Sequence, residues 1–150
     1  MIWHKTGPGP RVGNANKYHA KKTVIEVEGK PHVFDSHAEA RYYLRLKTLQ
    51  TVGEITSIEL QPKFELQPGY QKCCGKVWTI PVKTCFKCGK KIPKTPAIPY
   101  TADFRVTYKD GHVEIIDVKG VETREFIRVK KIFEYRYPEL TLKVVKGVRR

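Results

Sequence analysis

Two aspartates and a lysine in ADFRVTYKDGHVEIIDVKG, residues 102–120, have the types and spacing of a site that binds a cation. Asp103 precedes one apolar run, and Asp117 ends the next, two residues before Lys119. The three residues between the runs, 109–111, are typical of a hairpin loop with glycine in the left-handed position. A loop of that length places Asp103 opposite Asp117 on the neighbouring strand.

Two carboxylates that face each other in an antiparallel ladder have Cβ atoms about 4.5–5.5 Å apart, and their charges repel. A hard divalent cation such as Mg²⁺ between them would remove this repulsion. Alternation along the strand places Lys119 on the same face as Asp117, roughly 7 Å further along. A two-residue turn of Asp110 and Gly111 would instead send the two aspartates to opposite faces.

A third carboxylate, Glu39, lies in a segment with helical periodicity. Glu39 shares one stripe with the apolar residues Tyr42, Tyr43, Leu46 and Leu49, which indicates that it lies on the core-facing side of a helix. Glu39 also stands three residues after Ser36, the spacing of a capping box. The two roles are compatible.

One constellation of residues resembles the signature of the PD-(D/E)XK nuclease superfamily. It consists of Glu39 in a first helix, Asp103 on a strand, and Asp117 and Lys119 on the next strand. The run FDSHAEARYYLRLKTLQTVGEITSIELQPKFELQPG, followed by YTADFRVTYKDGHVEIIDVKG and KKIFEYRYPELTLKVV, is similar to small phage endonucleases that include Holliday junction-resolving enzymes. This likeness covers residues 34–145. Gln61 and Phe64 also match a Q-x-x-F strand of transposon end-cleaving nucleases.

The resemblance implies hydrolysis of phosphodiester bonds with Mg²⁺ or Mn²⁺ on a restriction-endonuclease-like core. Asp103 and Asp117 would bind the metal, and Glu39 would complete its shell directly or through water. The cation would lower the pKa of the attacking water. Lys119 would orient that water or neutralise charge in the transition state. Gln61 would reach the same pocket or serve as a buried hydrogen-bonding residue of the sheet.

All four cysteines, Cys73, Cys74, Cys85 and Cys88, fall in CCGKVWTIPVKTCFKC. CFKCG has the form of a zinc knuckle, whereas the first half supplies two adjacent cysteines. We therefore expect a structural Zn²⁺ in an insert at residues 70–96, with disulfides less favoured because nothing indicates secretion. His112 or another histidine could replace one cysteine.

The net charge of +14 is concentrated in two stretches. Residues 1–22 hold five Lys and Arg and no acid, and residues 71–95 hold seven Lys and no acid. With stacking residues beside these charges, the pattern favours nucleic acid over a membrane surface as partner, although a merely soluble basic protein also fits. The candidate phosphate-binding residues are Lys21, Lys22, Lys83, Lys87, Arg124, Arg128 and Lys131; the last three could equally form a solvated helix face.

The pattern along the chain predicts an α/β (α+β) fold with a mixed central sheet flanked by helices. We expect a flexible basic segment at 1–22 and one domain at 23–150 that contains the insert. The expected elements are a hairpin at 23–34, a helix capped by Ser36 and ended by Gly53, strands at 54–66, 98–108 and 112–119, a helix at 123–137 and a strand at 140–145. The sequence lacks a signal peptide and a membrane span, which indicates the cytoplasm, that of the host cell if the chain is phage-encoded.

These observations and the resemblance together predict a metal-dependent, structure-selective DNA endonuclease that resolves four-way junctions as a homodimer. Two alternatives stay open. One is a sequence-specific or transposon-type nuclease of the same superfamily, and the other is a zinc-containing DNA-binding protein without catalysis.

Overall fold

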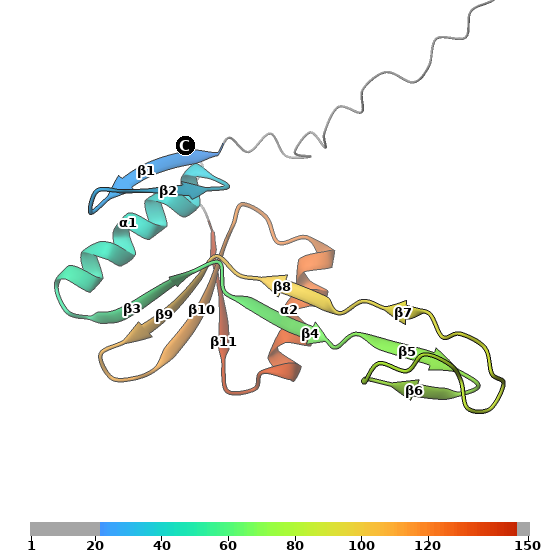
Figure 1. Ribbon diagram of the computed structural model, residues 1–150. Coiled ribbons are helices and arrows are strands. Elements are labelled where there is room, and N and C mark those ends of the chain that lie inside the picture. The colour runs from blue at the N-terminus through green and yellow to red at the C-terminus, as the bar shows by residue number, and fades with distance from the viewer. Residues whose placement is uncertain (1–21, 147–150) are drawn as a thin grey trace, which may run out of the picture.

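The computed structural model describes residues 22–146, which form a mixed α+β fold (Figure 1). The expected basic segment, including Lys21, therefore lies outside the described residues except for the exposed Lys22. The elements in chain order are β1 (Thr23–Val27), β2 (Lys30–Phe34), α1 (His37–Thr51), β3 (Ile55–Leu60), β4 (Lys63–Gln67), β5 (Tyr70–Cys73), β6 (Lys76–Trp78), β7 (Lys94–Thr95), β8 (Ile98–Thr101), β9 (Phe104–Tyr108), β10 (Val113–Lys119), α2 (Arg124–Arg136) and β11 (Thr141–Lys146).

A four-stranded sheet in the order β11-β10-β9-β3 forms the centre of the body. The pair β10 and β11 is parallel and the other pairs are antiparallel, so the sheet is mixed, as predicted. Successive residues of β10 point to opposite faces: Ile116 packs with the α1 side chains Tyr43 and Leu46, whereas Ile115 packs with Phe126 and Phe133 of α2. Each helix thus covers one face. Within residues 22–146, no helix is long and apolar enough to cross a bilayer.

Both helices begin and end where the sequence predicts. The hydroxyl of Ser36 accepts a hydrogen bond from the Glu39 N–H at the start of α1, and Gly53 follows its last turn with a φ of 79°. Thr123 caps α2 in the same way, and α2 ends two residues before Pro138. These caps satisfy backbone donors that would otherwise lack partners.

The prediction of one strand over 98–108 is wrong, because the chain bends at Asp103 and forms β8 and β9. The opposite strand bends at Gln61, which has a φ of 50°, and at Pro62, as the sequence indicates. Backbone hydrogen bonds run across the bend: the Gln61 N–H donates to the Asp103 carbonyl at 2.9 Å, and the Ala102 N–H donates to the Pro62 carbonyl at 3.1 Å. The two strands therefore stay paired while they change direction.

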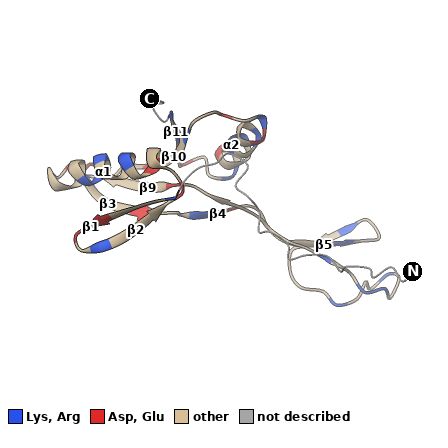
Figure 2. Cartoon of the chain, turned by 90° about the horizontal axis from the view of Figure 1, so that it is seen from above, with Lys and Arg blue, Asp and Glu red and all other residues tan. Residues whose placement is uncertain are grey.

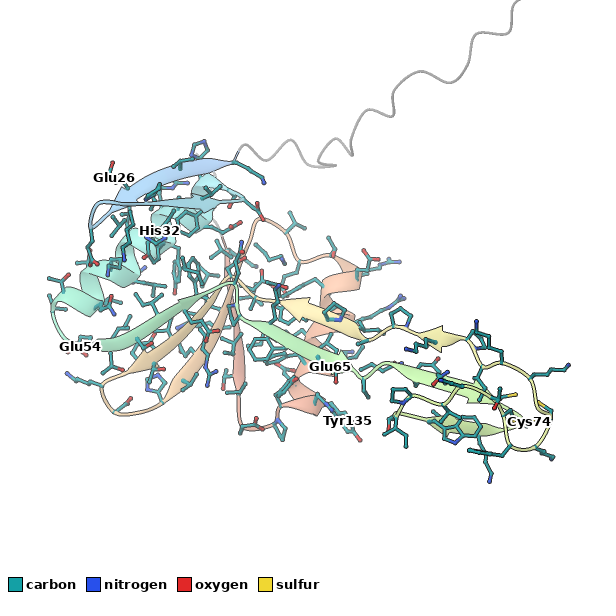
Figure 3. The ribbon with its side chains drawn as sticks, viewed as in Figure 1. Glu26, His32, Glu54, Glu65, Cys74 and Tyr135 are labelled. Atoms are coloured by element: carbon teal, nitrogen blue, oxygen red, sulfur yellow. The ribbon has the colours of Figure 1, made fainter. Side chains whose placement is uncertain are left out.

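Beyond this bend, the paired strands β4 and β8 lead out of the body to the cysteine insert (Figure 1). We call residues 70–96 the finger. Strand β5 pairs with β6 on one side and β7 on the other, and Cys74 lies at the end of the finger far from the body (Figure 3). Lysines are spread along the finger, which contains no acidic residue (Figure 2).

Candidate functional site

The bend places Asp103 beside the C-terminal half of β10. The hairpin has the register that a three-residue loop predicts, since Ile116 pairs with Phe104 and Gly111 has a φ of 87°. Asp103 is the next residue after the ladder. Its N–H donates to the Ile116 carbonyl at 3.1 Å, and its Oδ2 accepts from the Val118 N–H at 2.6 Å. Asp103 thus binds the backbone on both sides of Asp117.

Asp117 is almost fully buried, with 1% of its surface exposed. Its Oδ2 accepts a hydrogen bond of 2.7 Å from the hydroxyl of Tyr100, and its Oδ1 lies 2.8 Å from the ammonium of Lys119. Oδ1 is fully buried, and the ion pair with Lys119 compensates its charge. A buried carboxylate needs a compensating charge, and Lys119 provides it here.

Lys119 reaches Asp117 from the edge of the core. Its side chain is about one third exposed, and its ammonium lies 4.9 Å from the centre of the Phe126 ring of α2. The ring favours a cation at this distance. Helix α2 therefore helps to hold the lysine that neutralises Asp117.

Glu39 uses both carboxylate oxygens to cap α1. Oε1 accepts from the Ser36 hydroxyl at 2.8 Å, and Oε2 accepts from the Asp35 N–H at 3.1 Å. The Ser36 half of the capping box is therefore present, while Glu39 binds the N–H of Asp35 in place of that of Ser36. Glu39 is half-buried, and this burial raises its pKa, although the hydrogen bonds from Ser36 and Asp35 partly offset the effect.

The electrostatics of Asp103 show that these groups share one neighbourhood. Burial is the largest cause that raises the Asp103 pKa, to about 7, and the negative charges of Asp117 and Glu39 raise it further. The Val118 N–H and the Lys119 charge act in the opposite direction. Three carboxylates and one ammonium thus interact at one end of the sheet, which leaves a deficit of positive charge there.

The carboxylates differ from the cysteines in how tightly they converge. Within residues 22–146, the four cysteines form the group in which at least three ligating side chains lie close enough together to hold an ion. Mg²⁺ is commonly bound by only one or two carboxylates and completes its shell with water and phosphate. Asp103 and Asp117 are two such carboxylates, but both oxygens of Asp117 already contact Tyr100 and Lys119. Direct binding by Glu39 would require it to leave its cap.

The remaining predicted residues occupy separate places. Gln61 is exposed, so a buried role in the sheet is wrong, and only its backbone contacts Asp103. His112 contacts Asp110 through a 2.6 Å pair of Nδ1 and Oδ1, not the cysteines. The other candidates are exposed on the finger or on α2: Lys83, Lys87, Arg124, Arg128 and Lys131.

Sequence reasoning missed a basic groove on the α1 face of the sheet. The groove has a volume of about 270 Å³ and lies between α1 and β11. Its cationic side chains are Arg41, Arg45 and Lys146. Its floor includes Val118, which packs with α1, on the opposite face of the sheet from Tyr100, the partner of Asp117. The spacing of the two arginines, one helical turn apart, was the available signal.

The four cysteines form a compact sulfur cluster on the finger. Their Sγ atoms all lie within 4.8 Å of one another, with Cys73 3.5 Å from Cys88 and 3.7 Å from Cys74. A tetrahedral zinc site with Zn–S bonds of about 2.3 Å has sulfurs roughly 3.8 Å apart, so the cluster fits Zn²⁺. None of the four is in a disulfide.

The second half of the cluster is built as a knuckle. The Gly89 N–H donates to the Cys85 carbonyl at 2.8 Å, and Gly89 has a φ of 66°. The backbone N–H groups of Cys88 and Lys87 point at the Cys85 sulfur and lower its pKa to about 6. Because zinc binds thiolates, this loop favours the binding form of Cys85.

Comparison with known proteins gives a family and no function. Residues 15–149 match the family DUF1064, described as a protein of unknown function. No curated protein and no solved structure matches the chain. Since the match spans most of its length, the chain belongs to the DUF1064 family.

Proposed function

We propose that this protein is a Mg²⁺- or Mn²⁺-dependent DNA endonuclease with a restriction-endonuclease-like core. The observation that carries the proposal is the meeting of Asp103, Asp117 and Lys119 at one end of a mixed sheet, beside the capped Glu39. A buried carboxylate next to a second carboxylate of raised pKa is stabilised when a divalent cation binds.

Each residue has a distinct role in this proposal. Asp103 and Asp117 hold the cation, which supplies an activated water and polarises the phosphoryl oxygen. Tyr100 and the Val118 N–H fix the two carboxylates. Lys119 stabilises the negative charge that develops on the phosphate, and Glu39 acts on the hydrated ion through water.

The substrate is double-stranded DNA with a branch, and the enzyme acts as a homodimer. The basic groove at Arg41 and Arg45 contacts one backbone on the α1 face of the sheet, and the lysines of the finger contact DNA further out. Each chain has one such site, so paired cuts across a four-way junction require two chains. A DNA substrate of this kind places the protein in the cytoplasm, that of the host cell if a phage encodes it.

Cleavage of a synthetic four-way junction tests the proposal. Wild type with Mg²⁺ should cut the junction, and Asp117→Asn should bind it with similar affinity without cutting. Asp110→Asn, a change in the exposed hairpin loop, is the matched control and should cut normally. Equal cutting of linear duplex would favour the sequence-specific or transposon-type alternative.

A specific observation favours a second function, zinc-dependent DNA binding without catalysis. Both oxygens of Asp117 contact groups of the chain itself, Tyr100 and Lys119. Binding of the junction without cutting in Mg²⁺ or Mn²⁺ would establish this function and refute the endonuclease.

A further inference from the structure

A pocket on the finger has no role in the proposed chemistry. Its volume is about 360 Å³, within the range of small-ligand sites. It lies between β5, β6 and β7, and its lining is mostly apolar. The side chains that matter here are Tyr70, Trp78, Ile80, Pro81, Lys94 and Pro96.

A buried glutamine holds the pocket open. Gln71, 4% exposed, donates from Nε2 to the carbonyls of Val82 and Ile92 at 2.8 Å each, and its Oε1 accepts from the Val82 N–H at 2.7 Å. These three bonds fix the loop after β6, which contributes Thr79, Ile80 and Pro81 to the wall. A buried polar network whose bonds are all made specifies one conformation, so the pocket is preformed.

The apolar surface of the finger stays open to solvent. Ile80 is 70% exposed and Trp78 is only partly buried, although both are large side chains in a small unit. An exposed concave apolar surface of this kind marks a binding site. The occupant must therefore carry a flat or apolar group small enough to enter a pocket.

The charge around the pocket decides between classes of partner. Residues 71–95 contain seven lysines and no acid, and Lys94 lies at the pocket itself. A ligand that is anionic along its length and carries flat aromatic groups is a nucleic acid strand with unpaired bases. The paired strands β4 and β8 connect the bend at Asp103 to the finger (Figure 1). The carboxylates and the pocket thus lie at the two ends of one continuous pair of strands.

We propose that the finger pocket binds an unpaired nucleobase, stacked on Trp78, with Lys94 contacting the adjoining phosphate. Bases inside a continuous duplex cannot enter, so the pocket distinguishes DNA with unpaired nucleotides from fully paired DNA. The inference rests on the proposed function in one respect, that DNA is the ligand, and it needs no cleavage.

The test uses the full-length, zinc-loaded chain without Mg²⁺, so that the DNA stays intact. Trp3→Phe leaves Trp78 as the one tryptophan. A short duplex with one unpaired adenine should quench Trp78 fluorescence, and its fully paired counterpart should not. Trp78→Ala should weaken binding of the first duplex roughly 5- to 100-fold and leave the second nearly unchanged.

Matched variants separate stacking from folding. Trp78→Phe, which keeps an aromatic ring, should retain most of the preference, and its zinc content should equal that of wild type. Val77→Ala, at an exposed neighbour on β6, should retain all of it. Quenching by both duplexes alike, or an equal loss of affinity for both in Trp78→Ala, would overturn the inference.

Three further outcomes are decisive. Quenching by vesicles of phosphatidylcholine and phosphatidylserine, without quenching by DNA, would assign the pocket to a membrane surface and refute base binding. If the chain cuts no DNA yet prefers the unpaired duplex through Trp78, the endonuclease proposal fails and the base pocket stands. If the chain cuts DNA normally and its binding does not depend on Trp78, the base pocket fails and the endonuclease proposal stands.

Discussion

At the scale of single residues, the candidate site holds two carboxylates that are largely buried and differ in how their charges are compensated. Asp117 is neutralised by Lys119, whereas Asp103 has only a backbone N–H and distant charge to stabilise its ionised form. Burial without a close counter-charge raises the pKa of a carboxyl group. The ionised Asp103 carboxylate therefore destabilises the folded state.

Removing the Asp103 charge should make the protein more stable at neutral pH. Its pKa is about 7 in the folded chain against an ordinary 3.8, so the folded state binds more protons between these values. The free energy of unfolding therefore falls as pH rises through this range and levels off above it. Asp103→Asn should flatten this slope and gain on the order of 1–4 kcal/mol at pH 8, because one pKa unit is about 1.4 kcal/mol.

Urea unfolding from pH 4 to pH 8, without divalent cations, measures this effect. Asp110→Asn is the control with the opposite sign, because contacts with His112 lower the Asp110 pKa. A slope that is unchanged in Asp103→Asn would mean that Asp103 is ionised throughout. The same variant should lose cutting, so stability and activity would change in opposite directions.

Tyr100 should matter more to stability than its single hydroxyl suggests. Tyr100→Phe leaves Oδ2 of a buried carboxylate without a donor, which costs about 1–3 kcal/mol. Tyr108→Phe removes an equivalent bond of 2.8 Å to Glu114, a more exposed carboxylate, and should cost less. Equal losses in chemical denaturation would show that Asp117 finds another partner.

At the scale of elements, the start of α1 combines a cap with a site residue. Glu39→Gln keeps a carbonyl oxygen and satisfies the capping box, so the free energy of unfolding should change by under about 0.5 kcal/mol. Glu39→Ala removes both bonds and should cost about 1 kcal/mol.

The two variants together separate the roles of Glu39. If it acts on the hydrated metal ion, Glu39→Gln should cut the junction much more slowly than wild type while unfolding at nearly the same urea concentration. Full activity in Glu39→Gln would assign Glu39 to the cap alone. Cutting rate and denaturation midpoint on one protein preparation provide both readings.

At the scale of the whole molecule, the finger and the body should respond differently to loss of zinc. The finger has few buried side chains, among them Cys85 and Ile92, too few to fold without metal. Cys85→Ser should lower bound zinc from about one equivalent per chain and increase hydrogen exchange over residues 70–96. The body, whose two apolar clusters lie on the faces of the central sheet, should keep its protection.

The sequence predicted the parts of this architecture that depend on local signals. The cap at Ser36, the glycine loop at Gly111 and alternation in β10 are encoded by neighbouring residues, and all are observed. The break at Asp103 was missed because alternation continues through it, and only pairing with the bent partner at Gln61 reveals it. The hydrogen bonds of Gln71 depend on residues distant in sequence, which no local pattern joins. The basic groove had a local signal only in the spacing of Arg41 and Arg45, because its other wall comes from β11.

The paired course of β4 and β8 makes the finger topologically a single long hairpin loop. Because its two ends are hydrogen-bonded neighbours, Glu65 opposite Pro99, a short turn could join them without rerouting any strand of the body. Excision and grafting of that loop are thus operations that the fold permits. Comparing the DNA binding of the chain with and without the finger would show what the finger contributes to the choice of ligand.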